Sequence, residues 1–278
     1  MTYSSALGER LELFFWFLQG NIGFERFSYN IKMIIDSTSE LLLLAPITVV
    51  VLFISGLSWW LHRRLHLTSV VFGSLFLIAN LGLWRETMQT LTIIIYASLM
   101  SMLIGVPIGV IVGHRPWLNK MLSPVLDLMQ TLPSFIYLIP TLVLFGLGSV
   151  PALISTVIFS MPSLIRFTQV GISTVPALFV EVGKSFGATK WQLFWKVEMP
   201  HALPSIMAGV NQCVMLSLSM VVISAIVGAG GLGTPVFRAL NTVNIPLGFE
   251  AGIAVVLLSL VLDRLTRVPK AGFGRCRY

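Results

Sequence analysis

The chain has 278 residues, of which 56% are hydrophobic and only 10% are charged, and its mean hydropathy is +0.90. Soluble domains carry roughly 25% charged residues, so this composition excludes a soluble globular protein and predicts an all-α polytopic membrane protein. The net charge of +7 is typical of basic cytoplasmic loops in such proteins and does not indicate nucleic-acid binding.

Residues 1–40 are expected to form an N-terminal segment outside the cytoplasm. The apolar patch at residues 11–18 is too short to span a bilayer, and no basic cluster or small-residue cleavage site indicates a signal peptide. Apolar residues recur at helical spacing at Phe27, Ile31, Ile34 and Ile35, which predicts an interfacial amphipathic helix. A loosely ordered terminus is the alternative.

Hydrophobic runs that predict about seven transmembrane helices follow. They cover residues 41–61, 67–83, 88–112, 124–147, 150–170, 203–227 and 246–265. Each is long enough to cross the hydrocarbon core at a rise of about 1.5 Å per residue. Only the sequence HRRLH separates the first two runs, which predicts a tight helical hairpin.

Proline recurs inside these runs, at Pro46, Pro107, Pro133, Pro140 and Pro162. Each proline removes a backbone donor and tends to kink a helix. Kinked helices suit a protein that opens and closes a path, whereas membrane bundles also tolerate proline in ordinary packing. The sequence favours neither interpretation over the other.

The basic residues predict the orientation of the chain. Of the 18 lysines and arginines, 13 lie in four regions on one predicted side: HRRLH, GHRPWLNKM, residues 166–201 and the tail from residue 264. The positive-inside rule places that side in the cytoplasm, with the N-terminus outside and the C-terminus inside. The polar stretch at residues 181–200 is therefore expected in the cytoplasm.

Two patterns of nucleotide-binding enzymes occur out of context. The GAGGLG sequence at residues 228–233 follows an apolar run and does not link a strand to a helix, so we interpret it as a helix terminator and a close-packed turn. The sequence Gly183-Lys184-Ser185 imitates the end of a phosphate-binding loop, but Leu178 stands where that loop requires glycine. No ATP site is expected in this chain.

No metal or catalytic site is expected either. The cysteines, Cys213 and Cys276, show no paired spacing, and the four histidines lie at predicted membrane edges, where they serve as interface anchors. Asp127 and Glu250 lie near the ends of their runs, where a charge reaches the interface at little cost.

The charged and aromatic stretch at residues 181–200 has helix-capping signals of its own. Pro176 suits the first turn of a short helix, and Gly187 can end that helix in a left-handed conformation. Thr189 and Gln192 have capping-box spacing, which predicts the start of a second helix. The pair Met199-Pro200 is expected to end it.

The second helix carries an aromatic face, with Trp191, Phe194 and Trp195 at helical spacing. Such a face can fit a groove on a partner protein. A helix pair lying on the bilayer surface would look the same in sequence, so the residues alone leave both interpretations open.

This stretch resembles the EAA loop of ABC-transporter permeases, which has Glu-Ala-Ala, three residues, Gly, nine residues, Ile, any residue and Leu-Pro. Glu181, Gly187 and Pro200 match the Glu, Gly and Pro at the family spacing, and Val197 and Met199 stand for Ile and Leu. The two alanines are replaced by valine and glycine.

The resemblance extends over residues 84–267, where DLMQTLPSFIYLIP, MPSLIRFTQVGISTVP, AGVNQCVMLSLSMVVI, VGAGGLG and LDRLTR are similar to permeases for glycine betaine, choline or related quaternary ammonium compounds. It implies a five-helix permease core of the type I importer kind, with a coupling loop at residues 174–200. Residues 41–83 would then be two accessory helices and residues 268–278 a basic cytoplasmic tail.

The resemblance also implies partners in the bacterial inner membrane. Two ATPase subunits would carry ATP and Mg, a soluble binding protein would deliver substrate from outside, and a second permease copy would complete the path. This chain would bind no cofactor and would not be an enzyme. The residues implied in coupling to the ATPase are Glu181, Gly187, Ala188, Trp191, Phe194, Trp195, Val197, Met199 and Pro200.

Polar residues inside the runs are candidates for the substrate path. They are Gln130, Tyr137, Asn211, Gln212, Ser217 and Ser219. The alternatives are a permease for another small solute, such as an amino acid or a sulfonate, or a channel or secondary transporter that works without an ATPase. A membrane-embedded enzyme would need a convergent catalytic set, which we do not find.

Overall fold

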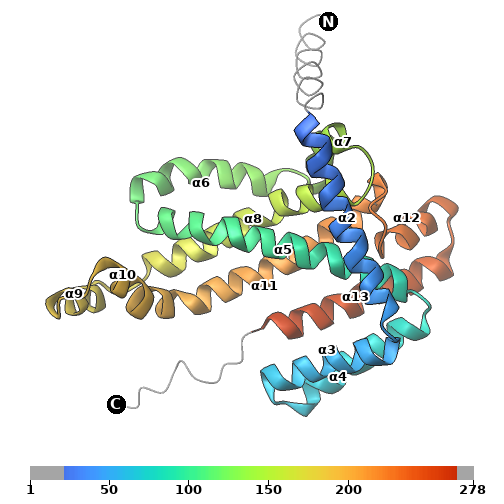
Figure 1. Cartoon of the computed structure of the whole chain (residues 1–278), viewed down its shortest axis with the longest axis horizontal. Helices are drawn as coiled ribbons and strands as arrows, with labels where there is room; N and C mark the ends of the chain where they lie inside the picture. Colours follow the sequence, from blue (N-terminus) through green and yellow to red (C-terminus); the bar gives the residue numbers. More distant parts are fainter. Residues whose placement is uncertain (1–21, 268–278) are drawn as a thin grey trace, which may run out of the picture.

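A computed structural model describes residues 22–267, which are entirely helical apart from turns (Figure 1). The apolar patch at residues 11–18, Cys276 and the basic tail at 268–278 lie outside the described residues, and so does the side chain of Phe27. The N-terminal half contains α2 (Ile22–Leu44), α3 (Ile47–His62), α4 (Leu65–Asn80), α5 (Trp84–Gly113), α6 (Pro116–Thr131), the 3-10 turn η1 (Ser134–Tyr137) and α7 (Leu138–Phe145).

The C-terminal half begins with the long helix α8 and ends with α13. Its elements are α8 (Ser149–Ser173), α9 (Ala177–Ser185), α10 (Lys190–Leu193), the π-helical turn η2 (Phe194–Glu198), α11 (Met199–Ile223), the 3-10 turn η3 (Ser224–Val227), α12 (Gly233–Thr242) and α13 (Ile245–Thr266).

Within residues 22–267, four helical segments are long and apolar enough to cross a membrane: α5, α8, α13 and the continuous segment Lys190–Val227. The number rises to six if each of two bent helix pairs counts as one span. The remaining apolar run forms α4, which has only 16 residues. The seven runs in the sequence thus appear as four unbroken helical segments, two bent helix pairs and one shorter helix.

Prolines explain both bends. α2 and α3 meet at 101° and α6 meets the η1–α7 unit at 106°, so the first and fourth runs are each broken, at two of the prolines that the sequence indicated as sites of kinking. Pro46 and Pro133 lie at these breaks, and Leu132 is extended (ψ 137°) because a residue before proline is disfavoured in the helical region. Pro107 and Pro162, by contrast, lie inside uninterrupted helices.

The centre of the bundle is formed by α5, α8 and α11, which run side by side and make the most extensive contacts of the fold (Figure 1). α5 approaches α8 closely because it presents glycine there: a Cβ added at Gly109 would lie 2.6 Å from Thr168 Cβ and 2.8 Å from Ile165 O. Small residues of this kind let membrane helices pack backbone to backbone. The α3–α4 hairpin packs mainly on α13, at the periphery of this centre.

Gly109→Ala is expected to destabilise the protein by about 1–3 kcal/mol, because the added methyl group overpacks the α5–α8 contact. Gly56→Ala is the matched control, since a Cβ there meets nothing within 4 Å. Thermal unfolding of the purified protein should show a lower Tm for the first variant only. Equal Tm values for both would contradict the tight contact.

The GAGGLG sequence forms the close-packed turn that the sequence predicted. Gly228 ends η3 with a φ of +79°. The backbone N–H groups of Gly231 and Leu232 donate to Gln89 Oε1 (3.0 Å) and Thr90 Oγ1 (2.8 Å) of α5. These bonds fix the turn to the start of α5.

Candidate functional site

The polar stretch between α8 and α11 projects beyond the ends of the long helices as two short helices, α9 and α10 (Figure 1). Pro176 is the residue before α9, and Gly187 ends that helix with a φ of +76°. The N–H of Gly187 donates to Lys184 O (2.9 Å) and the N–H of Ala188 donates to Gly183 O (3.0 Å). This pair of bonds is a Schellman motif, so the glycine hinge has the predicted geometry.

α10 starts with the predicted capping box. The N–H of Gln192 donates to Thr189 Oγ1 (3.3 Å), and the N–H of Thr189 donates to Gln192 Oε1 (2.9 Å). Two caps therefore fix the chain on either side of the hinge.

The predicted stop at Met199-Pro200 is wrong, because the helix continues through η2 into α11. The N–H of Met199 bonds Phe194 O, five residues earlier. This widened turn accommodates the proline that follows, which has no N–H of its own to donate. As a result, α10 is the first part of the continuous helical segment Lys190–Val227.

α9 has an unexpected apolar surface. None of its residues is buried, and Leu178, Phe179, Val182 and Phe186 are exposed, the last by 87%. Sequence reasoning missed these side chains, although Leu178, Val182 and Phe186 have the spacing of one helical face. An exposed apolar surface beyond the bundle is typical of a protein-docking site.

The aromatic face of the second helix forms a packed cluster. The Trp191 ring lies 6.1 Å from that of Phe194 and 5.6 Å from that of Trp195. Phe194 and Met199 pack against a buried cluster at the ends of α8 and α11, whereas both tryptophans remain exposed. Phe194 therefore anchors the cluster to the bundle, and Trp191 and Trp195 form its exposed side.

The two short helices also contact each other. Leu193 is buried, and a Cβ added at Gly183 would lie 2.6 Å from Leu193 Cδ1. The glycine that replaces an EAA-loop alanine thus leaves room for this leucine. Glu181 is exposed and its carboxylate has no partner among residues 22–267, while Ala188, Val197 and Pro200 are half-buried.

One polar contact joins η2, which follows α10, to the end of α5. His114 Nε2 lies 2.7 Å from the carboxylate of Glu198, which is 9% exposed, and His114 Nδ1 lies 2.8 Å from Val110 O. Both ring nitrogens therefore face oxygen acceptors. Sequence reasoning interpreted this histidine only as an interface anchor.

Glu198→Ala is expected to lower the free energy of unfolding by about 1.5–3 kcal/mol, which is the contribution of a hydrogen bond to a charged group. His114→Ala should have a similar effect, and the double variant should be no worse than either single variant. Thermal unfolding of the purified protein measures all three. Additive losses would mean that the two side chains act independently.

The substrate-path candidates fall in several places. Gln130 and Gln212 line one groove of about 410 Å³ between α6, α8 and α11, together with Phe159 and Arg166. Tyr137 packs edge-on against Phe159 at a ring distance of 5.8 Å and donates its hydroxyl hydrogen bond to Met129 O. These three candidates are thus brought together.

The other three candidates lie elsewhere. Ser217 is fully buried inside the bundle, and Ser219 lines a separate groove between α11 and α13. Asn211 contacts α13: its Nδ2 donates to Asp263 Oδ1 (3.4 Å), and its Oδ1 accepts from Thr266 Oγ1 (2.5 Å).

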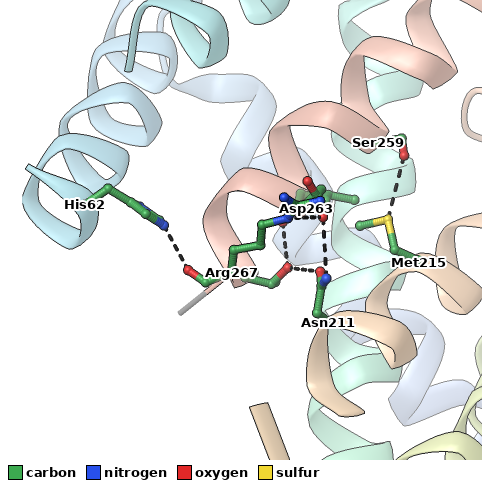
Figure 2. A network of polar contacts seen from close by, with 8 residues as sticks. His62, Asn211, Met215, Ser259, Asp263 and Arg267 are labelled. Carbon is green, nitrogen blue, oxygen red and sulfur yellow. Dashed lines mark hydrogen bonds and ion pairs between the residues drawn. The ribbon is translucent and has the colours of Figure 1, made fainter. Parts of the chain in front are cut away.

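Figure 2 shows that Asn211 belongs to a wider polar network. Arg267 Nε donates to Asp263 Oδ1 at 2.9 Å, and the backbone oxygen of Arg267 lies 2.8 Å from His62 Nε2. The network therefore joins the end of α3 to the end of α13 and to α11. This arrangement gives Asn211 a bridging role between helices.

Comparisons with known proteins agree with this architecture. Residues 105–270 match the model of the family described as binding-protein-dependent transport system inner membrane component. The chain is 44% identical over 230 residues to the glycine betaine/carnitine transport permease protein GbuB of Listeria monocytogenes, covering 81% of this chain and 80% of that protein. It is 41% identical over 222 residues to the glycine betaine transport system permease protein OpuAB of Bacillus subtilis, covering 80% and 78%.

A third relative is the glycine betaine/proline betaine transport system permease protein ProW of Escherichia coli, 39% identical over 85% of this chain and 67% of that protein. An inward-facing structure of the MetNI methionine ABC transporter matches the fold with a TM-score of 0.60 at 23% identity, covering 65% of this chain and 91% of that chain. The chain therefore belongs to the family of inner membrane components of binding-protein-dependent transport systems, as a multi-pass ABC-importer permease that leaves ATP hydrolysis to a partner.

Proposed function

We propose that this permease imports glycine betaine, choline or a similar quaternary ammonium osmoprotectant. The observation that carries this substrate class is the 39–44% identity to three permeases whose names include glycine betaine. A permease for another small solute, such as an amino acid or a sulfonate, is the second candidate, and the MetNI likeness bears on the fold alone.

The proposed orientation has the N-terminus outside and the C-terminus in the cytoplasm of a bacterial inner membrane. The loops after α3 and α5, which carry Arg63, Arg64 and Arg115, lie toward the same end of the bundle as α9 and α10 (Figure 1). Basic residues gathered at one end support a cytoplasmic assignment of that end. Residues 84–267 would form the core, and the α3–α4 hairpin would be accessory.

In the proposed assembly, two copies of the permease form a path and an ATPase subunit docks on each α9–α10 segment. The exposed apolar side chains of α9 and the two tryptophans supply the docking surface. Because α10 continues into α11, a movement of the ATPase would tilt a whole span, and the His114–Glu198 contact would pass it to α5. An outer binding protein would deliver the solute.

Uptake of labelled glycine betaine tests the substrate class. A strain that lacks its own osmoprotectant importers should gain uptake when it expresses this permease with its ATPase and binding protein. Unlabelled choline, carnitine and proline betaine should be tested as competitors beside amino acids and sulfonates. If only an amino acid or a sulfonate competed, and none of the quaternary ammonium compounds did, the osmoprotectant assignment would be overturned.

A further inference from the structure

The groove between α6, α8 and α11 brings a cationic side chain, aromatic rings and amides together. Its volume of about 410 Å³ lies within the roughly 300–1,000 Å³ of small-molecule sites. Its lining includes one cationic side chain, Arg166, two aromatic rings, Phe159 and Phe167, and two amides, Gln130 and Gln212. The side chains come from three helices, so the groove depends on their packing.

Two polar atoms of the lining have no partner within residues 22–267. They are Ser163 Oγ, in a residue that is 4% exposed, and Arg166 Nε. Buried polar groups in folded proteins are nearly always hydrogen-bonded. Both residues line the groove, but the two atoms themselves have almost no accessible surface, so a molecule in the groove supplies the missing hydrogen bonds only after a small shift of the lining side chains.

The ionic groups at the groove are also costly unless water or solute reaches them. Arg166 lies in the apolar helix α8, about 10 Å before its end at Ser173 by the helical rise. It pairs with Asp127 of α6, and their side chains are 36% and 62% exposed. Charges exposed to lipid at this depth are unfavourable, so such groups face a wet cavity or another protein surface.

We propose that this groove is a passage site for a zwitterionic solute that carries a quaternary ammonium group and a carboxylate. Arg166 binds the carboxylate, because its planar guanidinium offers parallel donors that match two carboxylate oxygens. Phe159 and Phe167 receive the quaternary ammonium, which cannot donate a hydrogen bond and is attracted to aromatic faces. Ser163 and the two glutamines complete the hydrogen bonds of the carboxylate.

The ion pair gives this site a means of release. Asp127 holds the guanidinium when no solute is present, and the incoming carboxylate competes with it for the same donors. The solute therefore binds weakly, which allows it to leave the site and continue along the path. This inference rests on the proposed function, because it specifies how the osmoprotectant is recognised within the membrane subunit.

The first test measures uptake by the complete transporter in proteoliposomes. Arg166→Gln is expected to lower glycine betaine uptake at least tenfold while choline uptake, where the transporter supports it, changes less, because choline has no carboxylate. Combining Asp127→Arg with Arg166→Asp keeps an ion pair but moves the guanidinium to α6. Restored uptake in that double variant would overturn the proposal, since it would assign the arginine a structural role only.

The second test does not depend on transport. Gln130→Cys, introduced together with Cys276→Ser, places an exposed thiol in the groove, and its reaction with a trimethylammonium thiol reagent is followed in the complete transporter. Glycine betaine should slow this reaction, sucrose of equal osmolarity should not, and Arg166→Gln should remove the protection. An unreactive thiol, or protection that persists without the arginine, would overturn the proposal.

Different results would overturn the proposed function and the passage site. If the wild-type transporter imports no quaternary ammonium solute, the proposed function is wrong. If it imports glycine betaine and Arg166→Gln imports it equally well, only the passage site is wrong. An equal loss of glycine betaine and choline uptake, without protection of the thiol, would indicate that the arginine stabilises the bundle and does not bind solute.

Discussion

Gly187→Val is expected to abolish ATP-driven uptake while the protein still inserts and folds its core. Gly187 has a φ of +76°, a conformation that is strongly unfavourable for a β-branched residue and costs about 1–3 kcal/mol. Relieving that strain would break the Schellman bonds that hold the end of α9 and would change the angle between α9 and α10.

The matched control is Gly187→Asn, because asparagine tolerates the left-handed region and a Cβ at this position meets nothing within 4 Å. Uptake by the asparagine variant should stay close to that of the wild type. Both variants are compared by uptake in proteoliposomes and by binding of the ATPase subunit. Normal uptake by the valine variant would mean that the hinge angle is not important for coupling.

Phe186→Ser is expected to weaken binding of the ATPase subunit about tenfold or more, as truncation of a central aromatic contact in an interface does. Its side chain is 87% exposed in the isolated chain, so the thermal stability of the permease alone should not change. Affinity is measured with the purified ATPase subunit and the permease in nanodiscs.

Leu147→Ser provides the control for Phe186→Ser. Leu147 is 75% exposed but lies just before the other end of α8, away from the coupling segment. Its replacement should leave the affinity for the ATPase subunit unchanged. Equal losses in the two variants would point to a general effect of removing exposed apolar side chains.

The local features of the α9–α10 segment could be predicted because they depend on residues close in sequence. The end of α9 at Gly187 and the Thr189–Gln192 capping box each involve only one or two turns of chain. The continuation through Met199-Pro200 could not be predicted, because it depends on the π-helical turn and on packing of Phe194 against α8 and α11.

Hydropathy identified the runs but not where they bend. Pro46, Pro107, Pro133 and Pro162 all lie in hydrophobic runs, and whether a proline breaks a helix or lies within it depends on its neighbours in the bundle. Arg166 and Asp127 are far apart in sequence and looked like separate charges near helix ends. Their pairing, and the groove beside them, arise only when α6, α8 and α11 pack together.

The central claim is that this permease moves solute only when an ATPase acts on the α9–α10 segment. Proteoliposomes containing the permease alone, the permease with the ATPase, and the full set with the binding protein give the most direct test, by uptake of labelled glycine betaine with and without ATP. We predict ATP-dependent uptake with the full set and none with the permease alone. Uptake by the permease alone, without ATP, would contradict the account and would indicate a channel or a secondary transporter.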